Sequence, residues 1–218
     1  MITTYTTFSE YYEDYKKRNL EEHSIARKGD WEFDISHIGT LSSYMYKRYW
    51  EVKGHMNIDE SRFEIIKHTK SNTWAVGRLI STEDGEEIFD RVLFLEMENA
   101  KNIGYKVQIS NLYRAKMVGV KENLRGYSIA KNIYKFLVKT QGYNIIGDVE
   151  QFFGARKLWK SLSNDTDVVV DIIDINAQDY IERNVTLHHG TDDWDFDKRI
   201  WDYEDSLKHI RLVLKDIL

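Results

Sequence analysis

The chain has 218 residues and a mass of 25.9 kDa, and 42% of its residues are hydrophobic and 31% charged. This composition supplies enough apolar surface for a folded core and excludes an intrinsically disordered chain. The absence of cysteine excludes disulfide scaffolds, thiolate metal sites and cysteine nucleophiles. No stretch approaches the ~18 apolar residues of a membrane-spanning helix. The first residues also lack the basic region and the following apolar region of a signal peptide. We therefore expect a single domain over residues 1–218, located in the cytoplasm, with no membrane partner.

The formal net charge of −5 is unevenly distributed along the chain. Between Lys101 and Lys139 lie nine basic residues and one acidic residue, Glu122. The residues from Asp192 to Asp205 carry seven acids and two bases. A basic segment within an acidic protein indicates a small anionic ligand in preference to a nucleic acid.

The first elements predicted by the periodicity are a strand and two helices. The β-branched run Ile2–Thr6 indicates a strand, and a helix is expected to start at Thr7, which has a capping-box spacing to Glu10. The apolar spacing over Leu41–Tyr49 predicts a second helix, which Gly54 is expected to end.

An antiparallel meander is predicted to follow, with a hairpin turn at Asp84-Gly85. Its predicted members are Arg62–Lys67, Thr73–Ile80, Ile88–Met97 and the extended stretch Tyr105–Val120.

Strands and helices are predicted to alternate in the C-terminal half. The expected elements are a helix from Ile129, a strand over Tyr143–Val149, a helix over Ala155–Leu162 and a strand over Asp167–Ile175. The helix from Ile129 carries Lys131, Lys135 and Lys139 on one face, a solvated stripe or a landing site for a phosphate. Residues 176–206 form a polar, acidic insertion with no regular pattern, and Leu207–Leu218 fits a strand and a helix equally well.

The most informative stretch runs from Met117 to Ala130, where an apolar strand turns through a charged loop into a helix. The first turn of a helix presents unpaired backbone N–H groups and a positive dipole end, which together bind phosphate groups. Small residues at Gly126, Ser128 and Ala130 would let a phosphate approach, and Arg125 adds a positive charge. An ordinary strand-to-helix turn is the alternative interpretation.

This stretch resembles the phosphate loop of the GNAT superfamily of N-acetyltransferases, in which Arg or Gln is followed by two residues, Gly, one residue, and Gly or Ala. The chain has Arg125-Gly126-Tyr127-Ser128-Ile129-Ala130, with Ser128 in the glycine position. A second block, Ala155–Leu162, resembles a later helix of that family, although Trp159 stands where many members carry a tyrosine and Phe152 where many carry an asparagine. GNAT-like proteins encoded by bacteriophages are a narrower resemblance.

The resemblance implies an α/β fold, layered, with a mixed, mostly antiparallel central sheet flanked by helices. It further implies transfer of an acyl group from acetyl-coenzyme A, or another acyl-coenzyme A, to an amine of a small molecule or a protein lysine. Coenzyme A contacts are then expected from the strand and the loop, at Val118, Val120, Arg125, Gly126, Tyr127, Ser128, Ile129 and Ala130.

The chemistry also needs a base for the amine and a proton or a positive field for the departing thiolate. Candidate bases lie at predicted strand ends, namely Asp148, Glu150, Glu96 and Glu98, and the candidate acids are Tyr134, Tyr127 and Tyr143. Each of these residues also has an ordinary structural interpretation, as a surface carboxylate or a packing tyrosine.

Two other functions stay open at the level of sequence. Trp159, Phe152 and Ser128 favour a GNAT-like binding or inhibitory protein without catalysis. The basic segment and the bacteriophage relatives raise an acyltransferase acting on nucleic-acid bases as a further alternative, although the net negative charge argues against it. No metal is expected, because the calcium-loop-like run from Asp193 to Glu204 has Lys198 where a glycine is required. The sequence does not identify the acceptor or the oligomeric state.

Overall fold

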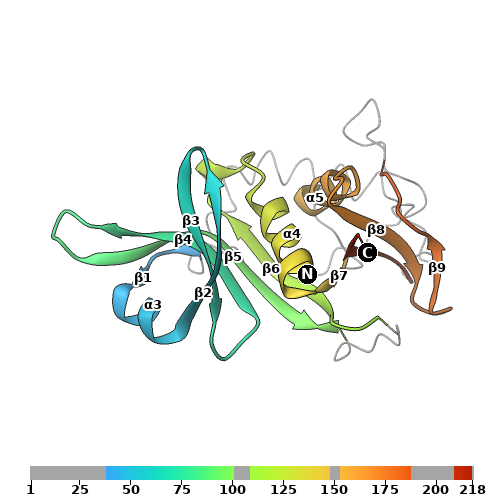
Figure 1. The fold of residues 1–218 in the computed structure, drawn as a ribbon, viewed down its shortest axis with the longest axis horizontal. Helices are drawn as coiled ribbons and strands as arrows, with labels where there is room; N and C mark the ends of the chain where they lie inside the picture. Colours follow the sequence, from blue (N-terminus) through green and yellow to red (C-terminus); the bar gives the residue numbers. More distant parts are fainter. Residues whose placement is uncertain (1–37, 101–108, 148–152, 188–208, 218) are drawn as a thin grey trace, which may run out of the picture.

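The computed structural model describes residues 38–100, 109–147, 153–187 and 209–217. These residues form a mixed α/β structure with a large, mostly antiparallel sheet and three α-helices within the described ranges (Figure 1). The predicted strand at Ile2–Thr6 and the helix from Thr7 lie outside the described residues.

The N-terminal half of the sheet is a meander that begins after a short helix. Strand β1 (Leu41–Ser42) leads into helix α3 (Ser43–Tyr49), and the four strands β2 to β5 follow directly. Their bounds are β2 (Trp50–Ile58), β3 (Ser61–His68), β4 (Thr73–Ser81) and β5 (Glu87–Asn99).

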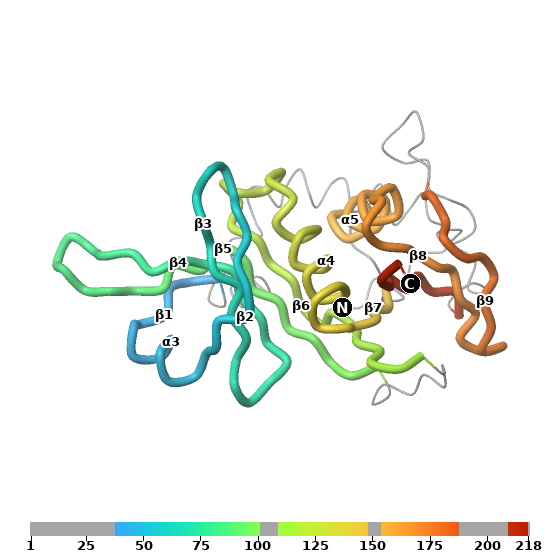
Figure 2. Tube along the Cα trace, viewed as in Figure 1, coloured from blue at the N-terminus to red at the C-terminus, as the bar shows by residue number. Residues whose placement is uncertain are grey.

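Strands β3, β4 and β5 confirm the predicted meander, and Gly85 has a φ of 79° in the turn expected at Asp84-Gly85. The β4–β5 hairpin extends away from the rest of the molecule (Figure 2).

Strand β2 corrects the prediction that Gly54 ends a helix. Helix α3 ends at Tyr49, the backbone becomes extended at Trp50, and Gly54 lies inside β2 beside the ring of Phe136. A two-residue turn, Asp59-Glu60, with φ values of 46° and 64°, joins β2 to β3. Such turns usually carry Asn-Gly or Asp-Gly. Because Asp59-Glu60 has no glycine, the sequence gives no signal for this hairpin.

The C-terminal half contains the crossover that carries the predicted loop. Strand β6 (Leu112–Val120) is followed by the 3₁₀ turn η2 (Glu122–Leu124), helix α4 (Ile129–Gln141) and strand β7 (Asn144–Ile146). Strands β6 and β7 are parallel, and α4 contacts both of them. In Figure 1, α4 lies across one face of the sheet beside β6.

The remaining elements extend the sheet beyond β7. They are helix α5 (Phe153–Ser163), strand β8 (Val168–Asp174), strand β9 (Asp179–Glu182) and strand β10 (Ile210–Asp216). Strand β10 settles the ambiguous tail: it is a strand that pairs antiparallel with β7 and β8. Strand β9 corrects the expectation of irregular structure after residue 176, because it pairs with the edge of β8.

The main hydrophobic core lies between the sheet and the helices α4 and α5. The buried face of α4 contains Ile129, Ile133 and Leu137, as the periodicity predicts, and α5 contributes Trp159 and Leu162. Helix α3 buries Tyr46 and leaves Tyr44 59% exposed, although the apolar spacing that predicted this helix includes Tyr44 and not Tyr46. Tyr46 packs in a separate cluster with Ile66, Ala75 and Phe89.

Candidate functional site

The loop between β6 and α4 is positioned by a buried residue and by two residues with positive φ. Ile129 is buried in the main core and fixes the start of the helix. Gly126 has a φ of 99°, and Ser128 has a φ of 58° in the left-handed region. Serine therefore adopts, at some cost, a backbone conformation that glycine adopts freely, in the position where the resembled family has glycine.

The start of α4 is open at the backbone level. Ser128 is the N-cap residue, yet its side chain makes no capping hydrogen bond. The helical ladder begins with the amide of Asn132, which donates to the carbonyl of Ser128 at 2.9 Å. The preceding amides of the first turn have no partner within the helix, so they form the positive end that a phosphate group can contact.

The side chains of the loop face solvent. Arg125, Gly126, Tyr127 and Ser128 are exposed, with Tyr127 at 46%, and Ala130 is half-buried. Ile129 can contribute only its backbone to a ligand, because its side chain is buried in the core.

Strand β6 has one edge that is paired over only part of its length. Its pairing with β7 covers Leu112–Arg114, and β7 ends at Ile146. Beyond Arg114, no strand in the described part of the chain pairs with that edge of β6.

The ladder on the other edge determines which amides face this unpaired side. The amide of Lys121 donates to the carbonyl of Val92 at 3.0 Å, and the register continues as Val120 opposite Leu93 and Gly119 opposite Phe94. Bonded and non-bonded pairs alternate in an antiparallel ladder. The amides of Val118 and Val120 therefore point away from β5, toward the side on which β7 has ended.

The two valines thus present N–H donors at the carboxyl end of a parallel strand pair, just before the loop and the start of α4. The carboxyl ends of parallel strands are the usual location of ligands in α/β sheets. This arrangement brings together Val118, Val120 and Arg125–Ala130 along one continuous stretch of chain.

The candidate catalytic residues are placed differently from one another. Glu96 lies on β5 opposite Met117 of β6, and its carboxylate accepts a hydrogen bond from Lys116 at 3.1 Å. Tyr134 is 4% exposed and packs in the main core, where burial raises the pKa of its hydroxyl well above the usual value. Asp148 and Glu150 lie outside the described residues.

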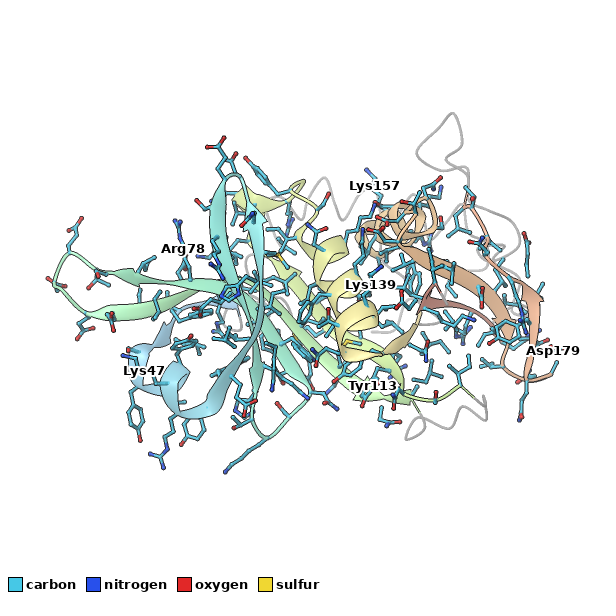
Figure 3. The ribbon with its side chains drawn as sticks, viewed as in Figure 1. Lys47, Arg78, Tyr113, Lys139, Lys157 and Asp179 are labelled. Atoms are coloured by element: carbon cyan, nitrogen blue, oxygen red, sulfur yellow. The ribbon has the colours of Figure 1, made fainter. Side chains whose placement is uncertain are left out.

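Trp159 and Tyr143, which were also singled out from the sequence, are buried core residues. Trp159 is buried among the main core residues, and Phe152 lies outside the described residues. Tyr143 stacks on Tyr113 with ring centroids 4.1 Å apart, and burial together with Tyr113 raises its pKa to about 12. Figure 3 labels Tyr113 at the end of β6 that is remote from the loop.

The basic segment is largely neutralised by acidic partners. Seven of its nine basic residues are described, and six of these seven form ion pairs, while Arg125 forms none with the described residues. The lysine stripe of α4 pairs with Asp165, Asp167 and Asp216. The distances are 2.8 Å for Lys131–Asp165, 2.9 Å for Lys135–Asp165, 2.6 Å for Lys135–Asp167 and 3.9 Å for Lys139–Asp216. The stripe is therefore a contact between α4 and the C-terminal strands, on the side of α4 where Figure 3 shows Lys139.

The sequence analysis missed two residues beside the unpaired edge of β6, Arg114 and Lys116. Each bonds an acid of β5: Arg114 donates to Glu98 through its Nε at 2.7 Å, and Lys116 donates to Glu96. Lys116 is also the extra residue of a β-bulge, because Glu96 pairs with Met117 whereas Met97 pairs with Ala115. The signal in the sequence is weak, since the cross-strand register is needed to see these pairs.

The chain matches no family model, no curated protein and no solved structure. Within the described residues, no helix is long and apolar enough to cross a membrane. Also within those ranges, no group of three or more His, Asp and Glu residues is arranged to hold a metal ion, and the run from Asp193 to Glu204 lies outside them.

Proposed function

We propose that the protein is an acyl-coenzyme A-dependent N-acyltransferase that binds its acyl donor at the end of β6 and the start of α4. The observation that carries the proposal is the unpaired edge of β6. The amides of Val118 and Val120 face that edge, and the same chain continues directly into the open start of α4. An acyl-coenzyme A donor fits both features: its thioester carbonyl can contact the amides at the edge of β6, and its phosphate groups can contact the start of α4.

The element order supports the same proposal. In the resembled superfamily, a meander is followed by the loop and helix, a strand, a second helix and a final hairpin. Here β6, α4, β7, α5 and the antiparallel pair of β8 and β10 follow the meander in that order.

The proposed reaction is direct attack of a neutral amine on the thioester carbon. The new C–N bond forms as the C–S bond breaks, the amine loses a proton, and coenzyme A leaves as its thiolate. A backbone N–H at Val118 or Val120 stabilises the negative charge that develops on the carbonyl oxygen. The start of α4 and Arg125 hold the phosphates.

Glu96 is the best placed base among the described candidates. It lies on β5, the strand next to β6. Its side chain is 33% exposed, so its carboxylate can accept a proton from an amine in solvent. Tyr134 is a weaker candidate for the acid, because its hydroxyl belongs to a core residue whose pKa is raised by burial.

A cofactor-binding protein without turnover is the second candidate function. Its specific support is Trp159, which is packed in the core and has no hydroxyl to protonate a thiolate. Transfer of a proton by one side chain contributes about 10²–10⁴-fold to a rate, so its loss would slow an acyltransferase without abolishing the reaction.

The proposal is tested with Gly126→Val and a matched control, Ser128→Gly. Valine at a φ of 99° is strained by its backbone conformation, although nothing lies within 4 Å of the added Cβ. Glycine at position 128 instead removes the backbone strain of a serine in the left-handed region. We expect Gly126→Val to weaken acetyl-coenzyme A binding at least tenfold by calorimetry and Ser128→Gly to preserve it.

Release of free thiol in the presence of amines distinguishes the two candidate functions. Turnover that Gly126→Val abolishes supports the enzyme, and tight binding without turnover supports the binding protein. An absence of saturable binding at millimolar acetyl-coenzyme A would overturn the proposal.

A further inference from the structure

Two ion pairs bridge β5 and β6 at the point where β6 separates from β7. They are Glu96–Lys116 and Glu98–Arg114, which we call the charge ladder. Arg114 is the last residue of β6 that pairs with β7, through Ile146. Lys116, in the bulge, is the first ladder residue beyond that point. Bulges commonly lie next to active sites, where they redirect a side chain.

The ladder lies on the face of the sheet opposite α4. Along β5, Leu93, Leu95 and Met97 pack in the core beneath α4, and Glu96 and Glu98 alternate with them. Along β6, Ala115 and Val118 pack on that same core, whereas Arg114 and Lys116 bond the two glutamates. On the face opposite α4, Leu112 and Ile146 are buried, whereas the side chains of Lys116 and Glu96 are partly exposed, so an acceptor can reach the ladder at Lys116 and Glu96.

The ladder is close to the proposed site of the thioester. Val118 is two residues beyond Lys116 on the same strand, roughly 7 Å along β6. The side chain of Lys116 is 57% exposed and that of Glu96 is 33% exposed, so that both ends of this pair are open to a ligand.

We infer that the charge ladder recognises the acceptor, and that the acceptor is an amine with an adjacent carboxylate, as in a free α-amino acid. This inference rests on the proposed function. The ladder has two positive and two negative charges and no net charge. It therefore favours neither a polycation, such as a polyamine, nor a simple anion, but it complements a molecule that has one charge of each sign close together.

Binding of such a ligand would break ion pairs that contribute little to the stability of the protein. Partly exposed ion pairs are weakly stabilising, so they rearrange at little cost around an ammonium and a carboxylate. The carboxylate of the acceptor binds Lys116 and Arg114, and its ammonium faces Glu96. Glu96 takes a proton from the ammonium, and the resulting amine nitrogen forms a C–N bond with the thioester carbon as the C–S bond breaks. The nitrogen then loses a second proton, which the departing coenzyme A thiolate takes up.

The test compares α-amino acids with the amines that remain after their carboxylate is removed. Thiol release is measured with matched pairs such as glycine and methylamine, phenylalanine and phenethylamine, and ornithine and putrescine. We expect kcat/KM at least tenfold higher for the amino acid in at least one pair. Lys116→Gln and Arg114→Gln should raise KM for that amino acid and reduce its preference over the amine, with little effect on KM for the amine.

Glu96→Gln should lower kcat for both members of the pair. Lys47→Gln is the control, because Lys47 of helix α3 forms an exposed ion pair at 3.2 Å with Glu87, the first residue of β5. It should leave the preference unchanged. The melting temperature and the affinity for acetyl-coenzyme A are measured for every variant. They verify that each variant is folded and binds the acyl donor.

The outcomes separate the inference from the function on which it rests. Equal rates for amino acids and their amines, with acetyl-coenzyme A bound and turned over, overturn the inference alone. Binding of acetyl-coenzyme A without turnover of any acceptor overturns both the inference and the enzymatic proposal, and the binding-protein function remains. An absence of acetyl-coenzyme A binding overturns both functions and the inference.

Discussion

At the scale of single residues, Asp165 is the carboxylate that ties α4 to the start of β8. Its side chain is 10% exposed and bonds both Lys131 and Lys135, and it also accepts the amide of Asp167 at 2.9 Å. Burial alone would raise the pKa of Asp165, but the hydrogen bonds from the two lysines and from Asp167 lower it well below the usual range. The folded protein therefore binds a proton at Asp165 less readily than the unfolded chain does.

This difference makes the contribution of Asp165 to stability dependent on pH. Because its folded pKa lies below the unfolded value of about 4, the contribution is complete above pH 4 and is lost as the pH falls further. We expect Asp165→Asn to lower the free energy of unfolding at pH 7 by about 1–3 kcal/mol. The variant should also lose less stability than the wild type between pH 5 and pH 3.

Urea denaturation across that pH range measures both effects. Asp167→Asn is the matched control, because Asp167 also bonds Lys135 but its side chain is 54% exposed. An exposed pair of this kind is worth about 0–1 kcal/mol, so the control should be close to the wild type. Equal losses in the two variants would contradict a special role for Asp165.

At the scale of elements, the contact between β2 and α4 depends on a glycine. A Cβ added at Gly54 would lie 2.6 Å from Cε2 of Phe136, and the Phe136 ring in turn packs edge-on against Trp74, with centroids 6.2 Å apart. The register shift between Val52 and Gly54 places this glycine at a bulge of the edge strand. Gly54 therefore allows β2 to approach the helix closely.

We expect Gly54→Ala to destabilise the protein by about 1–3 kcal/mol, because the ring of Phe136 must move from its position against Trp74. Phe136→Leu makes room for the added methyl group. In a double-mutant cycle, the cost of Gly54→Ala should fall in the Phe136→Leu background. Additive costs in thermal denaturation would show that the two residues are not coupled.

At the scale of the whole molecule, most of the described basic residues between Lys101 and Lys139 are neutralised by ion pairs in the fold. Six of the seven described basic residues between Lys101 and Lys139 face carboxylates that are distant in sequence. The described part of the segment, residues 109–139, therefore does not form an extended positive surface of the kind that nucleic acids require.

We expect no saturable binding of a fluorescent 20-base-pair DNA duplex or a matched single strand below about 100 µM protein at physiological salt. Fluorescence anisotropy at two salt concentrations measures it. Micromolar binding that weakens steeply with salt would instead favour the nucleic-acid acyltransferase considered from the sequence.

The sequence by itself determined those elements whose pattern is local. The 3.6-residue periodicity of α4 and α5, the alternation of β3 to β5 and the Asp84-Gly85 turn each depend on residues close together in the chain. The strand, loop and helix around Gly126 were equally evident, because all three are formed by consecutive residues.

Only the tertiary structure decided the features that depend on partners far apart in sequence. The tail Leu207–Leu218 fitted either type of element, and pairing with β7 and β8 makes residues Ile210–Asp216 a strand. Strand β9 has too few apolar residues to be recognised, and it exists because the edge of β8 is available to it. Likewise, the unpaired edge of β6 and the charge ladder follow from cross-strand register, since β-pairing is a non-local interaction that no window along the sequence contains.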